Sequence, residues 1–507
     1  MENPGAIFAP HRESDRVAVV DLTGGGMREV RYRELAAGCE AVARGLRRAG
    51  LGAGARIGIL SGNAIAFYET FFGAMLAGAI ALPFNLRLAD DALAALVAHN
   101  DVDLLFVDAP NAGRLPAGAA KRMVVFGAAG PAGYEAFVDR GPFDAVAVPD
   151  DAPLLQPFTS GTTGLPKGIV LSAGAVRWAM RQMLPAGRAP DPTTVVSVAH
   201  PLYHKNAMLG SKGAFLNGGR VVMMERFDPE RFVDAIGRHG ITKVHTVPTM
   251  MARIMAQPDL VARIDQSSIR EVHMGSAPVS ERLFEEIRAA FPKANVRISY
   301  GVTEAGPMQF GEHPSAKKRP PRSIGYPLPE VQVRLVGGAS PDEGVLLIKN
   351  AGVMRGYYKA PEQSAARFDA EGWYVTGDIL RRDAEGFFYF VGRDDDMMVV
   401  NGTNLYPATV EETLLRHPGI AAAAVVAVND DVRGHVPVAF VVARPGVALD
   451  PAEIQAHCLA RAPAYQHPRL VRVVEELPLA GTNKVDVRRL RAIAGEAWAA
   501  AHATGRG

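Results

Sequence analysis

The amino-acid sequence predicts an α/β protein with a large N-terminal domain built from α/β subdomains and a small, mobile α+β C-terminal domain. The chain has 507 residues, which is too many for one hydrophobic core. Apolar strand-like runs alternate with helical patterns over most of its length, which is typical of a mostly parallel sheet. A polar link at 392–396, Gly-Arg-Asp-Asp-Asp, precedes a separate final unit. We therefore expect one domain over 1–392 and a second over 393–507, with a hinge in this link.

The composition indicates a globular protein that does not bind nucleic acid. Hydrophobic residues make up 48% of the chain and charged residues 21%, which excludes a disordered chain. The formal net charge of +2 gives no electrostatic reason to expect a polyanionic partner. A basic cluster at 317–322 lies among prolines and is interpreted as a solvated loop, with contact to the phosphates of a bound cofactor as the alternative.

Neither the cysteines nor the apolar segments indicate export or a membrane span. Cys39 and Cys458 are the only cysteines and lie far apart, so the sequence has no disulfide framework and no metal-ligand spacing. The N-terminus lacks the basic and apolar regions of a secretory signal. The longest apolar run, 71–84, is shorter than the roughly 20 residues that a membrane span requires. We expect a cytoplasmic protein without a transmembrane segment.

The first part of the chain reads as alternating strands and helices without catalytic groups. Strands are expected at 17–22, 56–60, 80–83 and 104–107, and helices at 32–50 and 64–78. Strands separated by helices of this length imply a mostly parallel sheet. We expect this region to be structural.

A loop at 159–168, Thr-Ser-Gly-Thr-Thr-Gly-Leu-Pro-Lys-Gly, has the composition of a phosphate-binding loop. Glycine lets backbone N–H groups turn toward an anion, and hydroxyl and ammonium groups add donors. Pro166 and Gly168 flank the lysine, so the loop lacks the Gly-Lys-Ser/Thr ending of an ordinary P-loop NTPase. A flexible linker is the alternative, but linkers seldom run through Pro-Lys-Gly into a strand. The candidate phosphate ligands are Thr159, Ser160, Gly161, Thr162, Thr163, Gly164 and Lys167.

Small and polar residues follow two further predicted strands. The strand at 195–199 leads to His204, for which a satisfied structural histidine is the alternative. The strand at 271–274 leads to a tetrapeptide of small residues that lets a flat ring lie against the backbone. Ligands usually bind at the carboxyl ends of strands in α/β sheets, so both segments are candidate site elements. The tetrapeptide consists of Gly275, Ser276, Ala277 and Pro278.

A strand that starts at residue 296 ends in Tyr300, Gly301, Thr303 and Glu304. Tyr300 offers a ring to stack on a base, and Thr303 offers a hydroxyl to a phosphate oxygen. Mg²⁺ prefers carboxylate and phosphate oxygens together, so the Glu304 carboxylate beside a triphosphate is a sufficient metal ligand. A solvent-facing Thr-Glu helix cap is the alternative.

The last part of the chain predicts the small α+β unit. A strand at 387–391 ends the large domain, and beyond the link strands are expected at 399–400, 422–428 and 438–442 and helices at 407–416 and 451–461. Four polar or small residues in turns and loops are candidates here. As isolated residues they would be turn positions and a surface lysine, so their meaning depends on their order and spacing. They are Asp378, Arg393, Gly402 and Lys484.

In order and spacing these blocks resemble the adenylate-forming (ANL) superfamily, which includes acyl-CoA synthetases of the AMP-dependent synthetase and ligase family, adenylation domains of peptide synthetases, and luciferases. The resemblance spans nearly the whole chain in five ordered blocks. It implies that the loop at 159–168 binds phosphate and that 275–278 form the adenine wall. It also implies that Asp378 and Arg393 contact the ribose, and that His204 lies between the acyl pocket and the nucleotide.

For the small domain, the resemblance implies that Asp396 is the pivot, that Gly402 lies in the loop that approaches the pantetheine arm, and that Lys484 is the mobile catalytic lysine. Four positions depart from the pattern of the family. Asn401 and Asn483 stand where glycine is frequent, and two residues after His204 are polar where many fatty acyl relatives carry apolar residues. These two are Lys205 and Asn206.

The function that this resemblance implies is an ATP-dependent acid–CoA ligase. A carboxylate attacks the α-phosphorus of ATP and releases pyrophosphate, and the CoA thiolate then displaces AMP from the acyl-adenylate. Lys484, Thr303, the phosphate loop and Mg²⁺ on Glu304 would stabilise the charge. A stand-alone adenylation enzyme that loads a phosphopantetheinyl carrier protein is the alternative. A nucleotide-binding protein without activity is a third, and the presence of Glu304 and Lys484 argues against it. The expected partners are a small carboxylic acid, ATP and CoA, with a homodimer as a further possibility.

The substrate is the least determined feature. If a helix continues from Tyr203 to Gly213, Lys205 and Lys212 share one face, with Asn206 beside it. Such a face is unsuited to a long fatty acyl tunnel, because burying an ammonium without a partner is costly. A compact acid that is polar or carries a second anionic group is one expectation. The alternative is that both lysines face solvent or pair with surface acids.

Overall fold

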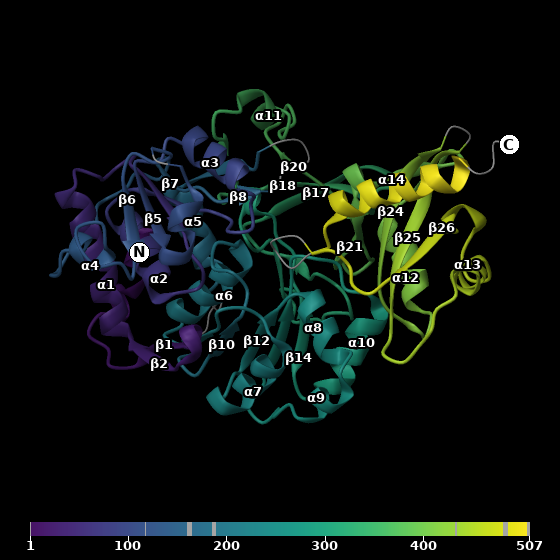
Figure 1. Cartoon of the computed structure of the whole chain (residues 1–507), viewed down its shortest axis with the longest axis horizontal. Coiled ribbons are helices and arrows are strands. Elements are labelled where there is room, and N and C mark those ends of the chain that lie inside the picture. The colour runs from purple at the N-terminus through teal and green to yellow at the C-terminus, as the bar shows by residue number, and fades with distance from the viewer. Residues whose placement is uncertain are drawn as a thin grey trace.

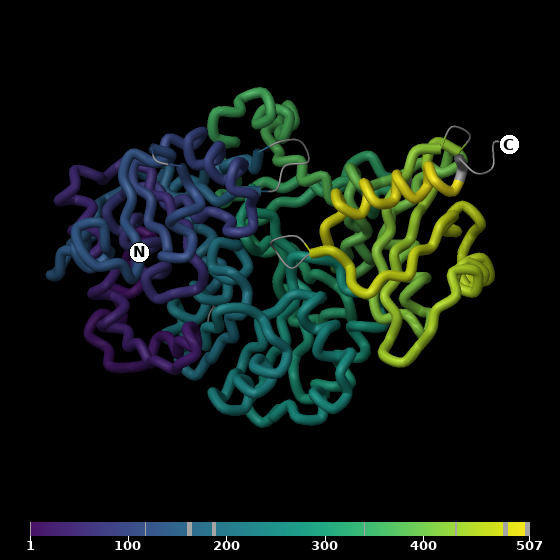
Figure 2. Tube along the Cα trace, viewed as in Figure 1, coloured from purple at the N-terminus to yellow at the C-terminus, as the bar shows by residue number. Residues whose placement is uncertain are grey.

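The large and small parts predicted from the sequence are both present in the computed structural model, which describes residues 2–116, 118–159, 165–184, 189–430, 433–479 and 485–503 (Figure 1). Figure 2 shows the green-to-yellow C-terminal part at one end of the long axis of the molecule. The α/β class and the large-plus-small architecture are confirmed. In the described part of the chain, no helix is both long enough and apolar enough to cross a membrane.

A seven-stranded sheet carries the predicted nucleotide segments. Its order is β14-β13-β12-β10-β11-β1-β2, and all pairs are parallel except β1 with β2. The strands are β1 (Val17–Asp21), β2 (Arg28–Arg31), β10 (Val195–Val198), β11 (Arg220–Met223), β12 (Lys243–Thr246), β13 (Glu271–Met274) and β14 (Asn295–Ile298). The helices of this region are α6 (Lys205–Leu216), α7 (Pro229–His239), α8 (Pro248–Met255), α9 (Pro258–Ala262) and α10 (Glu281–Ala290).

An eight-stranded sheet carries the predicted phosphate loop. Its order is β19-β9-β7-β4-β3-β5-β6, with β8 paired to β9. The strands are β3 (Arg56–Leu60), β4 (Ile80–Pro83), β5 (Leu104–Asp108), β6 (Met123–Phe126), β7 (Pro153–Leu155), β8 (Phe158–Thr159), β9 (Lys167–Ser172) and β19 (Gly356–Tyr357). The helices of this region are α1 (Tyr32–Arg48), α2 (Ile65–Leu76), α3 (Asp90–His99), α4 (Tyr134–Phe137) and α5 (Ala173–Arg181).

The sequence analysis was wrong to place the first four strands in one sheet. β1 pairs in parallel with β11, far along the chain, whereas β3, β4 and β5 lie together in the other sheet. Neighbours in sequence usually pair, but not always, and periodicity alone does not identify the partner of a strand. The expected mostly parallel pairing is correct within each sheet.

Aromatic side chains join the two sheets through their helices. Phe72 of α2 and Phe215 of α6 both pack edge-on against Phe8, at centroid distances of 5.2 and 5.1 Å. Tyr68 of α2 also contacts Phe215 at 5.4 Å, and its hydroxyl hydrogen-bonds to Ser211 Oγ of α6 at 2.7 Å. Buried aromatic pairs contribute beyond their area. These contacts fix the rotation of α6 about its own axis and therefore determine which of its faces is turned away from α2.

A third, antiparallel sheet lies between these sheets and the C-terminal part in the chain order. It has the order β17-β18-β20-β21, and a short pair, β15-β16, precedes it. The elements are β15 (Phe310–Gly311), β16 (Tyr326–Pro327), β17 (Gln332–Ser340), β18 (Glu343–Lys349), α11 (Pro361–Ala365), β20 (Tyr374–Arg382) and β21 (Phe388–Arg393).

The C-terminal part has its own sheet and its own apolar cores. The sheet order is β23-β22-β25-β24, with β26 parallel to β25. Its buried residues, from Met398 onward, form clusters separate from the core of the large part. Sheet membership therefore changes between β21 and β22, within the predicted polar link. The elements are β22 (Met398–Val400), β23 (Thr403–Leu405), α12 (Pro407–Leu415), β24 (Ile420–Asp430), β25 (Gly434–Ala443), α13 (Pro451–Leu459), β26 (Leu470–Val474) and α14 (Val487–Ala503).

One arginine of the large part contacts the end of a helix in the small part. Arg282 of α10 donates to the backbone carbonyls of Leu415, His417 and Ile420, each at 3.0 Å. Leu415 is the last residue of α12, so its carbonyl has no partner within the helix, and the guanidinium supplies one. Arg416–Glu281, Arg444–Glu286 and Arg322–Glu412 ion pairs surround this contact.

Candidate active site

The predicted adenine-wall residues and Tyr300 lie at one edge of the seven-stranded sheet. β13 and β14 are parallel neighbours, with Met274 opposite Ile298. The segments that follow the two strands therefore leave the sheet at the same edge. A side chain at Gly275 would place its Cβ 2.6 Å from Ser299 Oγ, so the Ser299 hydroxyl would have to move to admit any other residue. Ser276 has φ 72°, a strained conformation of the kind that is found at ligand sites. The edge brings residues 275–278, of which Ser276 and Pro278 are exposed, together with the aromatic ring of Tyr300.

Tyr300 and Asp378 are buried and are bonded to each other, and the half-exposed Arg393 completes the group. The Tyr300 hydroxyl donates to Asp378 Oδ2 at 2.5 Å, and Arg393 donates to Asp378 Oδ1 at 2.8 Å. Antiparallel pairing of β20 with β21 sets Asp378 directly opposite Arg393, which explains their contact. Burial raises the pKa of Asp378, whereas Arg393 and the Tyr300 hydroxyl oppose that rise. Each carboxylate oxygen keeps a lone pair, so Asp378 can accept hydrogen bonds from both hydroxyls of a ribose.

The two ends of the predicted phosphate loop are paired in the eight-stranded sheet. Thr159 of β8 lies opposite Lys167 of β9. The residues between these two positions include Ser160, Gly161, Thr162, Thr163 and Gly164, which lie outside the described residues.

Tyr357 connects this loop to Glu304. The Lys167 ammonium lies 5.2 Å from the centroid of the Tyr357 ring, and the Tyr357 hydroxyl donates to Glu304 Oε1 at 3.3 Å. Burial, followed by the charge of Glu304, raises the pKa of Tyr357 to about 12, so the hydroxyl stays a donor. The sequence analysis missed Tyr357, because it belongs to the two-residue strand β19, too short for a periodic pattern. Only the pairing of β19 with β9 in the structure brings Tyr357 beside the loop.

The residues around Glu304 fit a magnesium ion shared with phosphates. Glu304 contributes one half-buried carboxylate, and Thr303 beside it contributes a hydroxyl. Among the described residues, no group of three or more His, Cys, Asp or Glu side chains is arranged to hold a metal. Mg²⁺ commonly takes one or two protein carboxylates and fills its sphere with water and substrate phosphate oxygens. This donor set therefore suits a metal that arrives with a nucleotide, not a metal caged by protein.

An apolar cavity of about 70 Å³ adjoins this region. His204 and Thr303 both line it. At these two residues the cavity meets the edge of the seven-stranded sheet that carries Gly275 and Tyr300, which we call the nucleotide edge. Most of its other walls are apolar side chains of α5 and α6 and the strand ends beside them. This combination of an apolar pocket and a few converging polar groups is characteristic of a small-molecule site.

The alternative in which Lys205 and Lys212 face solvent is wrong. Both lysines line the cavity, and only 8% of the Lys212 surface is exposed. Lys205 Nζ donates to the carbonyl oxygen of Gly301 at 2.8 Å, which holds it at the nucleotide edge. Asn206 turns away from the cavity and joins a network of buried histidines, so it is not part of the polar face that the sequence predicted.

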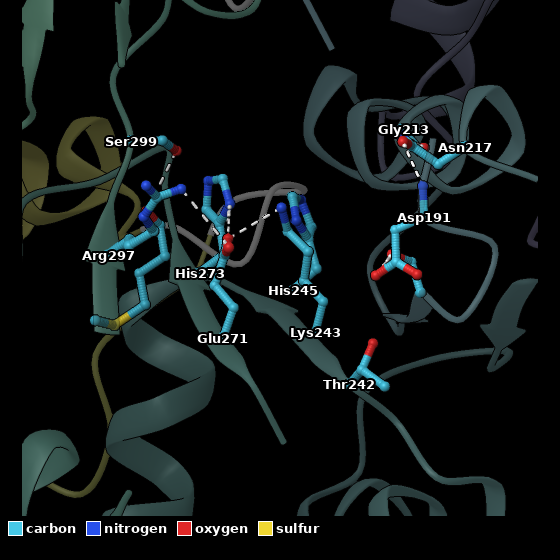
Figure 3. Close-up of polar contacts among 12 residues, drawn as sticks. Asp191, Gly213, Asn217, Thr242, Lys243, His245, Glu271, His273, Arg297 and Ser299 are labelled. Atoms are coloured by element: carbon cyan, nitrogen blue, oxygen red, sulfur yellow. Dashed lines mark hydrogen bonds and ion pairs between the residues drawn. The ribbon is translucent and has the colours of Figure 1, made fainter. Parts of the chain in front are cut away.

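That network lies beneath the nucleotide edge and anchors the first turn of α6. His245 Nε2 donates to Asn206 Oδ1 at 2.9 Å, and Asn206 Nδ2 donates to His200 Nε2 at 3.1 Å. The His245 ring also lies 5.0 Å from that of His273. Figure 3 shows the contacts of the Glu271 carboxylate with His273, Lys243 and Arg297. The nitrogens of these three side chains lie 3.3, 3.0 and 3.7 Å from its oxygens. Although burial raises the pKa of Glu271, Lys243 and its other partners hold it well below the usual range.

These histidines make stability depend on pH. Burial lowers the pKa of His200 to about 3 and that of His245 well below its usual value, with neighbouring histidines adding to the effect. Both stay neutral in the fold, whereas in the unfolded chain they bind protons below about pH 6.5. The free energy of unfolding should therefore fall as pH drops below about 6.5, by up to about 1.4 kcal/mol per pH unit for each histidine.

Urea unfolding followed between pH 7.5 and pH 5 measures this slope. The His245→Gln variant keeps a donor toward Asn206 but has no titrating ring. We expect it to be less stable than the wild type at pH 7.5 and to lose less stability on acidification. An unchanged slope would show that other groups cause the acid sensitivity.

Three predicted residues of the small part lie away from these groups or outside the described residues. Gly402 follows Asn401 at an exposed hairpin between β22 and β23, and both have positive φ, 78° and 49°. Asparagine followed by glycine is the preferred pair for such a turn, which explains the asparagine that departs from the family pattern. Asp396 accepts a hydrogen bond from Arg491 of α14 at 2.7 Å. Lys484 lies outside the described residues.

Comparisons with known proteins agree with this arrangement. The family model described as AMP-binding enzyme matches residues 8–358, and the model of the AMP-binding enzyme C-terminal domain matches residues 409–484. A feruloyl-CoA synthase from an Amycolatopsis species is 33% identical over 497 residues, with 96% of this chain and 97% of the relative covered. A sulfoacetate–CoA ligase from Cupriavidus necator is 31% identical over 494 residues, with coverages of 90% and 91%.

Among solved structures, the anthranilate CoA ligase AuaEII in complex with anthranoyl-AMP has the same fold. The TM-score is 0.86 at 23% identity, and the match covers 98% of each chain. The two family models and these relatives extend over both the large and the small part of the molecule. This chain therefore belongs to the AMP-binding enzyme family of adenylate-forming enzymes.

Proposed function

We propose that the protein is an ATP-dependent acid–CoA ligase that forms an acyl-adenylate and transfers the acyl group to CoA. One observation carries the proposal: His204 and Thr303 line an apolar cavity, and at the sheet edge Thr303 stands between Glu304 and Tyr300, which bonds to Asp378. An acid in the cavity would thus present its carboxylate to a nucleotide on that edge. The relatives named above as CoA ligases, aligned over nearly the whole chain, support the same reaction.

In the first half-reaction, the protein would act mainly by orienting the reactants and by stabilising negative charge. The Asp378 carboxylate, held by Arg393 and Tyr300, would bind the ribose, and 275–278 would flank the adenine. A carboxylate oxygen of the acid attacks the α-phosphorus, the bond to the β-phosphate oxygen breaks, and pyrophosphate leaves. Both reactants are anions, so the donors of the loop at 159–168, the Thr303 hydroxyl and the Lys484 ammonium would offset the charge. Mg²⁺, held by Glu304 and phosphate oxygens, would supply further positive charge there.

In the second half-reaction, the CoA thiolate attacks the acyl carbonyl carbon and AMP leaves. No protein nucleophile is needed. We propose domains at 1–392 and 393–507 that move about Asp396, so that Lys484 serves the first step and the loop with Gly402 approaches the pantetheine arm in the second. His204, at the junction of cavity and nucleotide edge, would control access to the acyl group.

The test of the proposal is pyrophosphate release over a panel of short, medium, aromatic and dicarboxylic acids, with and without CoA. We expect ATP-dependent release with at least one acid and an acyl-CoA product. Turnover only with a phosphopantetheinylated carrier protein would replace CoA by that acceptor. Nucleotide binding without pyrophosphate release from any acid would contradict the proposed function.

The Asp396→Pro substitution tests the proposed pivot. Asp396 ends the short 3₁₀ turn η5 (Asp394–Asp396) between β21 and β22. Proline fixes φ and restricts the residue before it, so we expect the domain movement to be impaired. Thioester formation from a supplied acyl-adenylate should fall by about tenfold or more relative to ATP–pyrophosphate exchange. Asp396→Asn is the control, because it loses the charge opposite Arg491 and keeps its backbone freedom. An unchanged balance of the two half-reactions in Asp396→Pro would place the pivot elsewhere.

A further inference from the structure

Lys212 is a buried cation in the wall of the apolar cavity. Only 8% of its surface is exposed, although lysine is almost never buried without a partner. Among the described residues, no carboxylate lies within ion-pair distance of its ammonium, and no acceptor receives a hydrogen bond from it. The ammonium makes a cation–π contact with the Phe71 ring, whose centroid lies 5.2 Å from Nζ.

The fold holds this ammonium inside the cavity. Ser211, the residue before Lys212, is tied to Tyr68 of α2, and Phe215 packs against the same helix. Rotation of α6 toward solvent would break both contacts. The cost is large, because a buried charge without a counter-ion is strongly unfavourable and a cation–π contact returns only about 0.5–2 kcal/mol. Burial lowers the pKa of Lys212 to about 8, so the group remains mostly protonated at neutral pH.

The geometry of α6 places Lys212 at the far end of the cavity from the nucleotide edge. Lys205, Met208, Leu209 and Lys212 line the cavity, a spacing of 3, 4 and 7 residues that gives one helix face. Lys205, at the start of the helix, bonds to Gly301 at the nucleotide edge. With a rise of about 1.5 Å per residue, Lys212 lies roughly 10 Å further along the axis, and its side chain leans back toward the helix start.

The cavity is also small. Its volume of about 70 Å³ corresponds to about five to seven water molecules. A compact molecule with one polar group at each end matches this space better than a long acyl chain, because the walls between the two ends are apolar and Lys212 lies at the far end.

We infer that the acid activated by this protein is a compact carboxylic acid with a second anionic group, a carboxylate or a sulfonate, at its far end, and that Lys212 selects it by pairing with that group. The inference rests on the proposed function, since the first carboxylate must lie beside His204 and Thr303. The anion of the substrate supplies the counter-ion that the cavity lacks. An acid with an apolar end would leave the ammonium buried and unpaired, so it binds less well.

The experiment compares pairs of acids that differ only in charge at the far end. Succinate is paired with 4-methylpentanoate, glutarate with 5-methylhexanoate, and terephthalate with 4-isopropylbenzoate, while 3-sulfopropionate separates sulfonate from carboxylate. We expect the wild type to prefer the dianion in at least one pair, by kcat/KM for pyrophosphate release. Lys212→Met should lower kcat/KM for that dianion by about 10- to 160-fold, the range of a charge-assisted hydrogen bond, without lowering it for the monoanionic partner.

Two further variants make the result specific to this side chain. Lys212→Arg keeps the charge and should retain the preference for the dianion. Lys317→Met removes an exposed lysine that pairs with Glu385, and it should leave the preference unchanged. Lys212→Met should fold, because replacing an unpaired buried charge by an apolar side chain of similar length is neutral or stabilising. Its melting temperature without ligand measures this directly, and Lys212→Gln serves if the methionine variant does not fold.

A binding measurement separates this inference from the proposed reaction. The preferred dianion alone should raise the melting temperature of the wild type and not that of Lys212→Met. If no acid supports pyrophosphate release but this shift is found, the anion site stands and the ligase reaction falls. If acids are activated but the monoanionic partners are preferred, or if Lys212→Met leaves the preference unchanged, the proposed ligase reaction is retained and the proposed role of Lys212 is wrong.

Discussion

Lys484→Ala is expected to lower the rate of acyl-adenylate formation by about 10²- to 10³-fold, which is typical for the loss of one group that stabilises charge in a transition state. The same variant should form the thioester from a supplied acyl-adenylate at close to the wild-type rate. The reason is that the ammonium would face the α-phosphate only while pyrophosphate leaves. ATP–pyrophosphate exchange measures the first half-reaction, and single-turnover formation of acyl-CoA from the adenylate measures the second.

Lys317→Ala is the matched control for this experiment. It removes one ammonium from an exposed ion pair with Glu385, and both half-reactions should be unaffected. Equal losses in the two half-reactions of Lys484→Ala would contradict the assignment, since a lysine that only maintains the structure would affect both steps alike.

Glu304→Gln should lower adenylate formation by about 10²-fold and raise the magnesium concentration needed for half-maximal exchange. The substitution keeps the shape of the side chain and an oxygen that can accept from the Tyr357 hydroxyl at the 3.3 Å contact. It removes the negative charge that a hard divalent cation requires. The effect should therefore appear in the metal dependence more than in the stability of the protein.

Exchange rates measured over a range of magnesium concentrations check this prediction, together with a thermal unfolding curve. Glu371→Gln is the control, because it neutralises an exposed carboxylate that pairs with Arg334. If Glu304→Gln loses activity with an unchanged magnesium requirement, then Glu304 acts through Tyr357 or the backbone and does not hold the metal.

Much of the candidate site could be predicted from the sequence because it lies at strand ends. Gly275 and Tyr300 follow short apolar runs, and parallel pairing brings such ends to one edge of a sheet without further information. The contact of Asp378 with Arg393 is different. It depends on the antiparallel register of β20 and β21, which the spacing along the chain does not determine.

The sequence predicted the lysine face of α6 but not its direction. Periodicity shows that Lys205 and Lys212 share one side of a helix, whereas only the packing of Tyr68 and Phe215 determines which side faces the cavity. Tyr357 could not be found at all, because a two-residue strand has no period. The buried histidines were also not identified from the sequence. His245 and His273 lie within strands whose apolar neighbours dominate the pattern.

The contact of Arg282 with the end of α12 gives the orientation of the small domain an energetic threshold. Three carbonyl oxygens, including that of the last helical residue, share one guanidinium from the large domain. In the proposed movement about Asp396 they must exchange this donor, the two N–H groups of Arg282 Nη1, for water, and a hydrogen bond to a charged group is worth about 1.5–3 kcal/mol. With the proposed movement, the orientation described here would be a discrete resting position, and catalysis would advance by leaving it and returning to it once in each cycle.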